Sequence, residues 1–143
     1  MPCARALFAG HQLRCTRQRL AIYESLRQCT THPTAEELYR LVRPGAGRLS
    51  LATVYNTLEA LCDAGLCRRL LATHGCCRYD ADTSDHLHLR FRDSGEIRDV
   101  PADLGLRLLD GLPQPVVEEI ERRLGVRIDG INIQLLASAI DRG

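Results

Sequence analysis

Three helix starts followed by two short strand patterns occupy residues 16–80, and this order limits the folds open to the chain. Thr16, Thr34 and Ser50 each precede an apolar pattern with helical spacing, where a hydroxyl can accept a bond from the first backbone N–H groups. "TAEE" at 34–37 is a capping box, and Gly65 follows the third pattern in a position that ends a helix. We therefore expect helices over about 16–29, 34–42 and 50–64.

Two strand patterns with outward-facing arginines follow these helices. "LCRRLLA" at 66–72 and "CCRYD" at 76–80 flank the turn sequence "THG" at 73–75, which predicts a hairpin. Three helices and a two-stranded wing predict a winged helix-turn-helix, an arrangement whose third helix enters the major groove of DNA.

The second half of the chain has a different pattern. "HLHLRF" at 86–91 and "EIRDV" at 96–100 predict another hairpin, and "ADLGLRLLDGL" and "PVVEEIERRL" predict two helices. Pro115 suits the first position of the second helix, and Gly125 ends it. "VRIDGINIQLLASA" at 126–139 predicts a long apolar strand. Because an exposed apolar edge has to be covered, we expect a homodimer.

These patterns predict an α+β chain of two domains. The first is a winged helix-turn-helix domain at 1–80, and a hinge at 81–84 joins it to a small α/β dimerisation domain at 85–143. The two parts differ in charge: residues 1–80 hold 11 Arg against 6 acidic residues, and residues 81–143 hold 8 against 12. A basic first half favours a nucleic-acid module, although two solvated surfaces of chance composition would give the same charges.

Membrane and secretory signals are missing from the sequence. No run approaches the roughly 18 apolar residues of a membrane span, and no apolar stretch with a cleavage site opens the chain. The seven cysteines contain no C-x-x-C pair, so we expect reduced thiols in a cytoplasmic protein. Spacing alone gives little support to redox sensing by Cys62 and Cys67.

Two clusters of polar residues carry the candidate chemistry. His86 and His88 repeat at strand spacing, with Asp80 before them and Asp99 after, as ligands of a hard metal would. An ordinary polar strand is the alternative interpretation. The second cluster lies at the start of the third predicted helix and after the first helix start, where hydroxyls, an aromatic ring and guanidinium groups could contact DNA. Its members are Arg17, Arg19, Ser50, Thr53, Tyr55 and Asn56.

The chain resembles the ferric uptake regulator family of metal-dependent repressors. "TRQRLAIYESL", "HPTAEELY", "LSLATVYNTLEAL", "RYD" and "DHLHL" followed by "SGEIRD" are similar to consecutive blocks of that family, over roughly residues 10–136. The resemblance implies a winged-helix DNA-binding domain, a dimerisation domain and a regulatory metal at the hinge. It also implies double-stranded DNA with a palindromic operator as partner, and no role as an enzyme.

By this resemblance, five residues match the regulatory ligands of the peroxide-responsive branch. They are His32, Asp80, His86, His88 and Asp99. Asn56 after "TVY", and aspartate rather than glutamate at position 99, point to the same branch. The implied metal is Fe²⁺ or Mn²⁺, which suits a set of imidazoles and carboxylates. The resemblance further implies that iron-bound peroxide chemistry oxidises His32 and His86.

The chain departs from the family at the structural zinc site, which most relatives build from two C-x-x-C pairs. Phe91 and Ser94 stand where the first pair would fall, and the second pair is missing after residue 136. We therefore expect no structural zinc. A regulator of iron or manganese supply, or a haem-responsive one, remains an alternative function. A small metalloenzyme using His86 and His88 is a weaker one, because no general base accompanies them.

Overall fold

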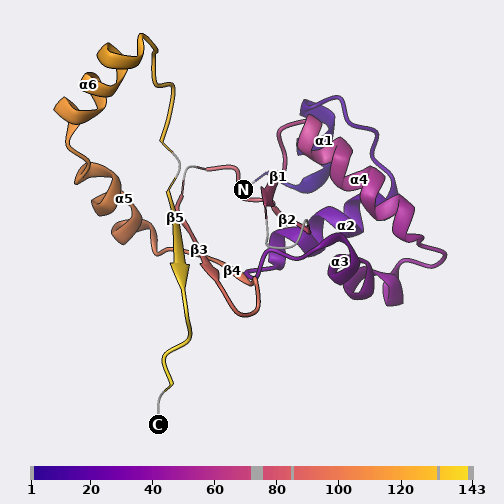
Figure 1. Ribbon diagram of the computed structural model, residues 1–143. Coiled ribbons are helices and arrows are strands. Elements are labelled where there is room, and N and C mark those ends of the chain that lie inside the picture. The colour runs from indigo at the N-terminus through magenta and orange to yellow at the C-terminus, as the bar shows by residue number, and fades with distance from the viewer. Residues whose placement is uncertain (1, 72–75, 85, 132, 142–143) are drawn as a thin grey trace. The chain divides into compact units, whose positions relative to one another are not determined.

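The computed structural model describes residues 2–71, 76–84, 86–131 and 133–141. It divides into two compact units, Met1–Ser84 and Asp85–Gly143 (Figure 1). None of the helices in these ranges is long and apolar enough to cross a membrane.

The first unit contains four α-helices, a short 3-10 helix and a two-stranded sheet (Figure 1). In chain order these are α1 (Ala4–Gly10), α2 (Arg17–Gln28), α3 (Ala35–Val42), η1 (Arg43–Gly45), α4 (Leu51–Asp63), β1 (Arg68–Leu71) and β2 (Cys77–Asp80). The strands pair antiparallel, with Arg68 opposite Asp80. The winged helix-turn-helix prediction is confirmed. Its three predicted helices are α2, α3 and α4, and β1 and β2 form the wing. The predicted turn at 73–75 lies outside the described residues.

Side-chain caps start the three predicted helices as expected. The hydroxyls of Thr16 and Ser50 accept from backbone N–H groups three residues further on, at 3.2 Å and 3.1 Å. Thr34 forms a complete capping box with Glu37, whose carboxylate accepts from the Thr34 backbone N–H. Gly65 adopts a φ of +75°, a left-handed conformation that glycine reaches without steric cost, and the chain turns there from α4 towards β1.

The sequence patterns missed helix α1. It is only seven residues long, and Cys3 before it provides no side-chain cap, so no start signal marks it. Packing stabilises it instead: Ala4 and Phe8 are buried, and the Phe8 ring lies 5.4 Å from that of Tyr23 on α2. These two aromatic residues join a core formed by α2, α3 and α4.

The second unit is a three-stranded sheet with two helices (Figure 1). Its elements are β3 (His88–Phe91), β4 (Ile97–Asp99), α5 (Ala102–Asp110), α6 (Gln114–Leu124) and β5 (Gln134–Ala137). β3 lies in the centre, antiparallel to β4 and parallel to β5. Ile97, Leu87 and Val100 are buried, and the Val100 N–H donates to the Leu87 carbonyl at 2.9 Å.

Two predictions for this unit need correction. The long strand expected at 126–139 is wrong, because among the described residues of that range only Gln134–Ala137 form a strand. The backbone N–H of Ile128 donates to the Glu121 carboxylate of α6 at 2.8 Å, so this part of the segment is held by the preceding helix. The second correction concerns Pro115, which occupies the second position of α6, because the helix begins at Gln114.

Candidate metal centre and DNA-facing surface

Two of the five predicted ligands meet within the first unit. His32 lies in the loop before α3, and Asp80 is the last residue of β2. Their exposed fractions are 2% and 4%, and His32 Nδ1 lies 3.5 Å from Asp80 Oδ1. The same oxygen accepts from the backbone N–H of Asp82 at 2.8 Å, which fixes the orientation of the carboxylate.

The backbone of His32 has an uncommon conformation that strand β2 supports. Its φ is +50°, which costs a residue with a side chain about 1–3 kcal/mol. Arg78 of β2 donates from Nη1 to the His32 carbonyl at 3.1 Å and to Glu37 Oε2 at 3.2 Å. The Tyr79 N–H also donates to the carbonyl of Pro33 at 3.0 Å. The loop that carries His32 is therefore bound along the strand that carries Asp80.

Arg78 corrects the expectation that the wing arginines all face outward. Its side chain is 13% exposed, whereas Arg69 on the paired strand is exposed. Sequence reasoning missed the support that Arg78 and Glu37 give to the His32 loop, although "RYD" contains Arg78 and "TAEE" contains Glu37.

The other three predicted ligands meet within the second unit. His88 pairs directly with Asp99 across β3 and β4. His86 lies just before β3, not within the strand as predicted, yet its imidazole faces the same carboxylate. Asp99 Oδ1 is 3.1 Å from His86 Nε2 and 3.4 Å from His88 Nε2, and the two ring centroids are 4.4 Å apart. Both imidazoles are largely buried, and the Asp99 side chain is 44% exposed.

These spacings fit metal coordination in each unit. Two ligand atoms at right angles around an ion with bonds of about 2.1 Å lie about 3.0 Å apart. The nitrogen–oxygen distances of 3.1–3.5 Å are close to that value. The donors are imidazole nitrogens and carboxylate oxygens without sulfur, a set that suits Fe²⁺ or Mn²⁺. Each unit therefore offers a partial coordination shell.

The β3–β4 hairpin carries Phe91 and Ser94, the positions at which the family resemblance placed the first missing C-x-x-C pair. The Phe91 N–H donates to the Glu96 carbonyl, and the Gly95 N–H donates back to the Phe91 carbonyl, each at 2.9 Å. The Arg98 guanidinium lies over the Phe91 ring at 5.2 Å, and the hydroxyl of Ser94 accepts from the Glu96 N–H. Hydrogen bonds and a cation–π contact hold this turn.

The start of α4 presents most of the predicted DNA contacts. Ser50 and Asn56 are exposed, and the hydroxyls of Ser50 and Thr53 lie 2.8 Å apart. Tyr55 is 43% exposed and donates its hydroxyl to Glu36 Oε1 of α3 at 2.5 Å. This hydrogen bond raises the pKa of Tyr55 to about 12 and lowers that of Glu36. The phenol therefore stays neutral, and its position on the helix is fixed.

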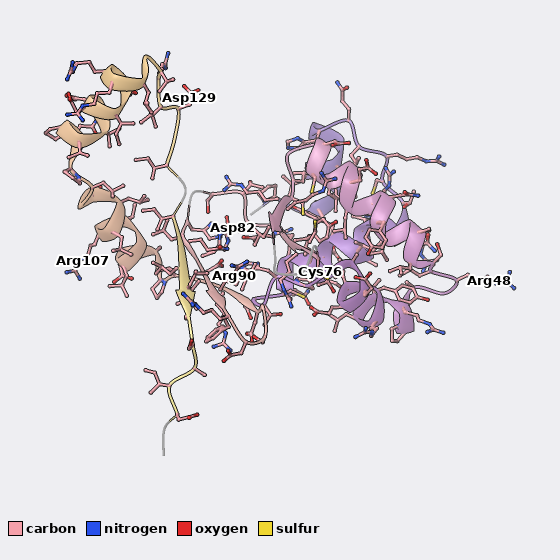
Figure 2. All side chains as sticks on the ribbon, in the orientation of Figure 1. Arg48, Cys76, Asp82, Arg90, Arg107 and Asp129 are labelled. Carbon is pink, nitrogen blue, oxygen red and sulfur yellow. The ribbon has the colours of Figure 1, made fainter. Side chains whose placement is uncertain are left out.

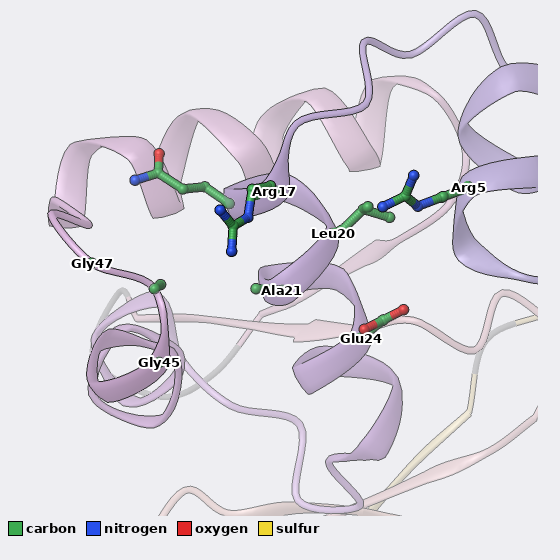
Figure 3. A pocket seen from close by; sticks show the side chains of 9 residues that line it. Arg5, Arg17, Leu20, Ala21, Glu24, Gly45 and Gly47 are labelled. Atoms are coloured by element: carbon green, nitrogen blue, oxygen red, sulfur yellow. The ribbon is translucent and has the colours of Figure 1, made fainter.

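Arginines extend this surface along α1, α2 and the loop before α4. Arg17 is exposed at the start of α2, and Arg19 donates to the Arg14 carbonyl at 3.2 Å. Arg48 projects from the loop away from the helices (Figure 2). A hollow of about 570 Å³ lies beside Arg17 and is also lined by Arg5 of α1 (Figure 3). Arg5 and Arg48 were not predicted, because α1 was missed and Arg48 lies outside the helix patterns.

The family model for the ferric uptake regulator family matches residues 10–109. The chain belongs to this family. It is 37% identical over 87 residues to the peroxide-responsive repressor PerR of Staphylococcus aureus strain Mu50. The matched region covers 61% of this chain. The chain spans 59% of the length of that relative.

Solved structures of the family share the fold. A zinc-bound manganese uptake regulator superposes with a TM-score of 0.73 at 26% identity, covering 97% of this chain and all of the other. The ferric uptake regulator of Vibrio cholerae gives 0.71 at 27% identity, covering 94% and 98%. The resemblance to the ferric uptake regulator family and the predicted α+β fold class are thereby confirmed.

Proposed function

We propose that the chain is a metal-dependent, DNA-binding transcriptional repressor that senses hydrogen peroxide through bound Fe²⁺. The observation that carries the proposal is the convergence of His86 and His88 on one oxygen of Asp99. Its similarity to a peroxide-responsive repressor supports the choice of signal. The role is regulatory rather than enzymatic, and we place it in the cytoplasm with the DNA.

The regulatory ion joins the two partial coordination shells in this proposal. His32 and Asp80 bind it from the first unit, and His86, His88 and Asp99 bind it from the second. Residues 81–84 act as the hinge between the domains at 1–80 and 85–143. Because such an ion binds only when both groups of ligands meet, it shifts the population towards one arrangement of the domains.

DNA recognition is assigned to α4 and the arginines beside it. Ser50, Thr53 and Asn56 contact phosphates or base edges from the start of α4, and the ring of Tyr55 packs on a thymine methyl. Arg17 and Arg19 neutralise phosphates. The excess of arginine over acidic residues at 1–80 favours this binding, which should weaken as salt rises.

A homodimer follows from the apolar surface of the second unit. Several large apolar side chains of α5, α6 and the last strand region are exposed within the chain, including Leu106, Val116, Ile120, Leu124 and Leu136. A twofold interface would cover such a surface and direct two copies of α4 towards the half-sites of a palindrome. The proposed partner is therefore double-stranded DNA with a palindromic operator, and no membrane takes part in the binding.

Peroxide sensing depends on which residues lie nearest the ion. Bound Fe²⁺ would supply the reduction of hydrogen peroxide beside the imidazoles that hold it, and Mn²⁺ is a much poorer reductant for this chemistry. His32 and His86 are the residues assigned as targets. Oxidation of either imidazole weakens it as a metal ligand. The ion then no longer joins the two units, and DNA binding is lost with it.

A regulator that responds to iron, manganese or haem supply is the second candidate. Similarity to a zinc-bound manganese uptake regulator over 97% of the chain is the observation that supports it. The same five ligands serve either function. The two candidate functions differ in the agent that releases DNA. A supply regulator releases DNA when a chelator removes the metal and does not respond to low peroxide, whereas a peroxide sensor with bound Fe²⁺ releases DNA at low peroxide.

Metal-gated DNA binding tests the shared part of the proposal. DNA that binds is first selected from a random pool with the Mn²⁺-loaded protein, and its affinity is then measured with metal and with chelator. His32→Ala should abolish the metal-dependent binding while the fold, followed by circular dichroism, stays intact. His11→Ala is the matched control, because His11 is exposed beyond the end of α1. Equal affinity of His32→Ala and wild type would refute the role of the ion.

A further inference from the structure

A hydrogen bond joins the last two helices of the helix-turn-helix on the surface of the first unit. The Tyr55 hydroxyl of α4 donates to Glu36 Oε1 of α3 at 2.5 Å, between residues 19 positions apart. Both residues are exposed, so the bond lies at the solvent side of the helix pair and outside the core. An exposed contact with a charged group contributes little to the stability of a fold. Its value to the protein therefore lies in where it holds the Tyr55 side chain.

The two helices keep both ends of this bond in place. α3 and α4 pack through the core, where Leu38, Val54 and Leu58 are all 0% exposed. Glu36 lies in the first turn of α3, where the positive end of the helix dipole favours a carboxylate. The hydrogen bond from Tyr55 lowers the pKa of Glu36, so this carboxylate is charged. The phenol is thus bound to a charged acceptor at a fixed position.

The bond also decides which part of Tyr55 is left for a ligand. A phenol has a single O–H donor, and here the Glu36 carboxylate accepts from it. The negative charge beside the hydroxyl repels a DNA phosphate from that end of the side chain. Tyr55 nevertheless keeps 43% of its surface exposed, and the apolar ring is the part that stays available for contact.

We propose that Glu36 positions the Tyr55 ring against a thymine methyl and so determines how strictly the protein distinguishes thymine from other bases. The inference rests on the proposed DNA binding by α4, and it adds a positioning residue on the preceding helix that acts through Tyr55. Thymine alone among the four bases presents a methyl group in the major groove, so an apolar contact there reads the base directly. A phenol released from Glu36 donates instead to a phosphate, a contact that carries no sequence information.

Replacement of thymine by uracil tests the proposal, because uracil differs from thymine only by the missing methyl group. DNA is selected from a random pool with the Mn²⁺-loaded protein, and each thymine of the selected site is then replaced in turn. In wild type, at least one position in each half-site should lose about fourfold in affinity, the factor for burying one methyl-sized group. Glu36→Ala should lower this factor towards one, so that thymine and uracil at that position bind alike.

Glu36→Gln is the matched control for the lost charge. It removes the same negative charge as Glu36→Ala but keeps a carbonyl oxygen that can accept from the Tyr55 hydroxyl. Both variants should gain the same affinity for unrelated DNA, whereas only Glu36→Gln should keep the discrimination between thymine and uracil. Tyr55→Phe removes the bond from its other end and should lose the discrimination too, with no further loss when Glu36→Ala is added.

A measurement without DNA checks the contact itself. Glu36 raises the pKa of Tyr55 to about 12, so the ¹³Cζ resonance should show a neutral phenol at about pH 10.5 in wild type and a largely ionised one in Glu36→Ala. Identical titration in the two proteins, or a uracil factor in Glu36→Ala equal to that of wild type, would overturn the role of Glu36 while DNA binding stands. If no DNA is selected, the proposed function fails and this inference fails with it.

Discussion

Replacing Arg78 with glutamine should destabilise the first unit and loosen His32. Arg78→Gln removes a charged donor from the buried His32 carbonyl, an interaction worth about 1.5–3 kcal/mol. It also breaks the ion pair with Glu37, whose side chain is 41% exposed, so solvent screening limits that loss to about 1 kcal/mol at most. The free energy of unfolding of the first unit should therefore fall by about 1.5–4 kcal/mol.

Tyrosine fluorescence measures this change in the first unit alone. All four tyrosines lie at 23, 39, 55 and 79, so a urea titration followed at their emission reports nothing of the second unit. Arg40→Gln is the matched control on the exposed face of α3, with an expected change below about 0.5 kcal/mol. Mn²⁺ affinity should fall about tenfold in Arg78→Gln, because the left-handed His32 backbone relaxes without its support. An unfolding curve that matches Arg40→Gln would refute the reasoning.

Three further outcomes are expected. Ile120→Glu should convert the dimer to monomers in analytical ultracentrifugation, while the exposed control Glu118→Ala stays dimeric. A dimeric Ile120→Glu protein would show that the interface lies elsewhere. Removal of metal with chelator should leave a folded dimer in circular dichroism and sedimentation; unfolded monomer would mean that a structural zinc site was missed. Asp99→Glu should keep Mn²⁺-dependent DNA binding but weaken the response to peroxide, because the longer side chain displaces the oxygen that faces His86 and His88. A DNA-release curve identical to wild type in peroxide titrations would contradict this assignment.

Local signals in the sequence were sufficient for most of the first unit. Thr16, Thr34 and Ser50 define helix starts through bonds to residues three positions away, so their effect can be predicted without tertiary structure. Helix α1 has no such signal and depends on the burial of Phe8, which only the assembled core provides. The segment at 126–131 was predicted as strand from its apolar residues, but the bond between Ile128 and Glu121 holds part of it beside α6.

The sequence indicated the residues of the candidate site, but not the contacts that support them. Strand spacing and the family resemblance singled out His86, His88 and Asp99. The β3–β4 register places His88 opposite Asp99, whereas the approach of His86, which lies before β3, to the same oxygen had to come from the structure. The left-handed backbone of His32 and its bond from Arg78 depend on residues 46 positions apart. No spacing rule connects such distant positions, so their contact had to come from the structure.

Mass spectrometry of histidine oxidation tests the central proposal most directly. The Fe²⁺-loaded and Mn²⁺-loaded proteins are treated with the same low concentration of hydrogen peroxide, and the peptides that contain His32 and His86 are compared while DNA release is followed in parallel. We predict one added oxygen on His32 or His86 and release of DNA in the iron form alone. Release of DNA from the iron form with both histidines unmodified, or equal histidine oxidation in the two forms, would contradict iron-based peroxide sensing.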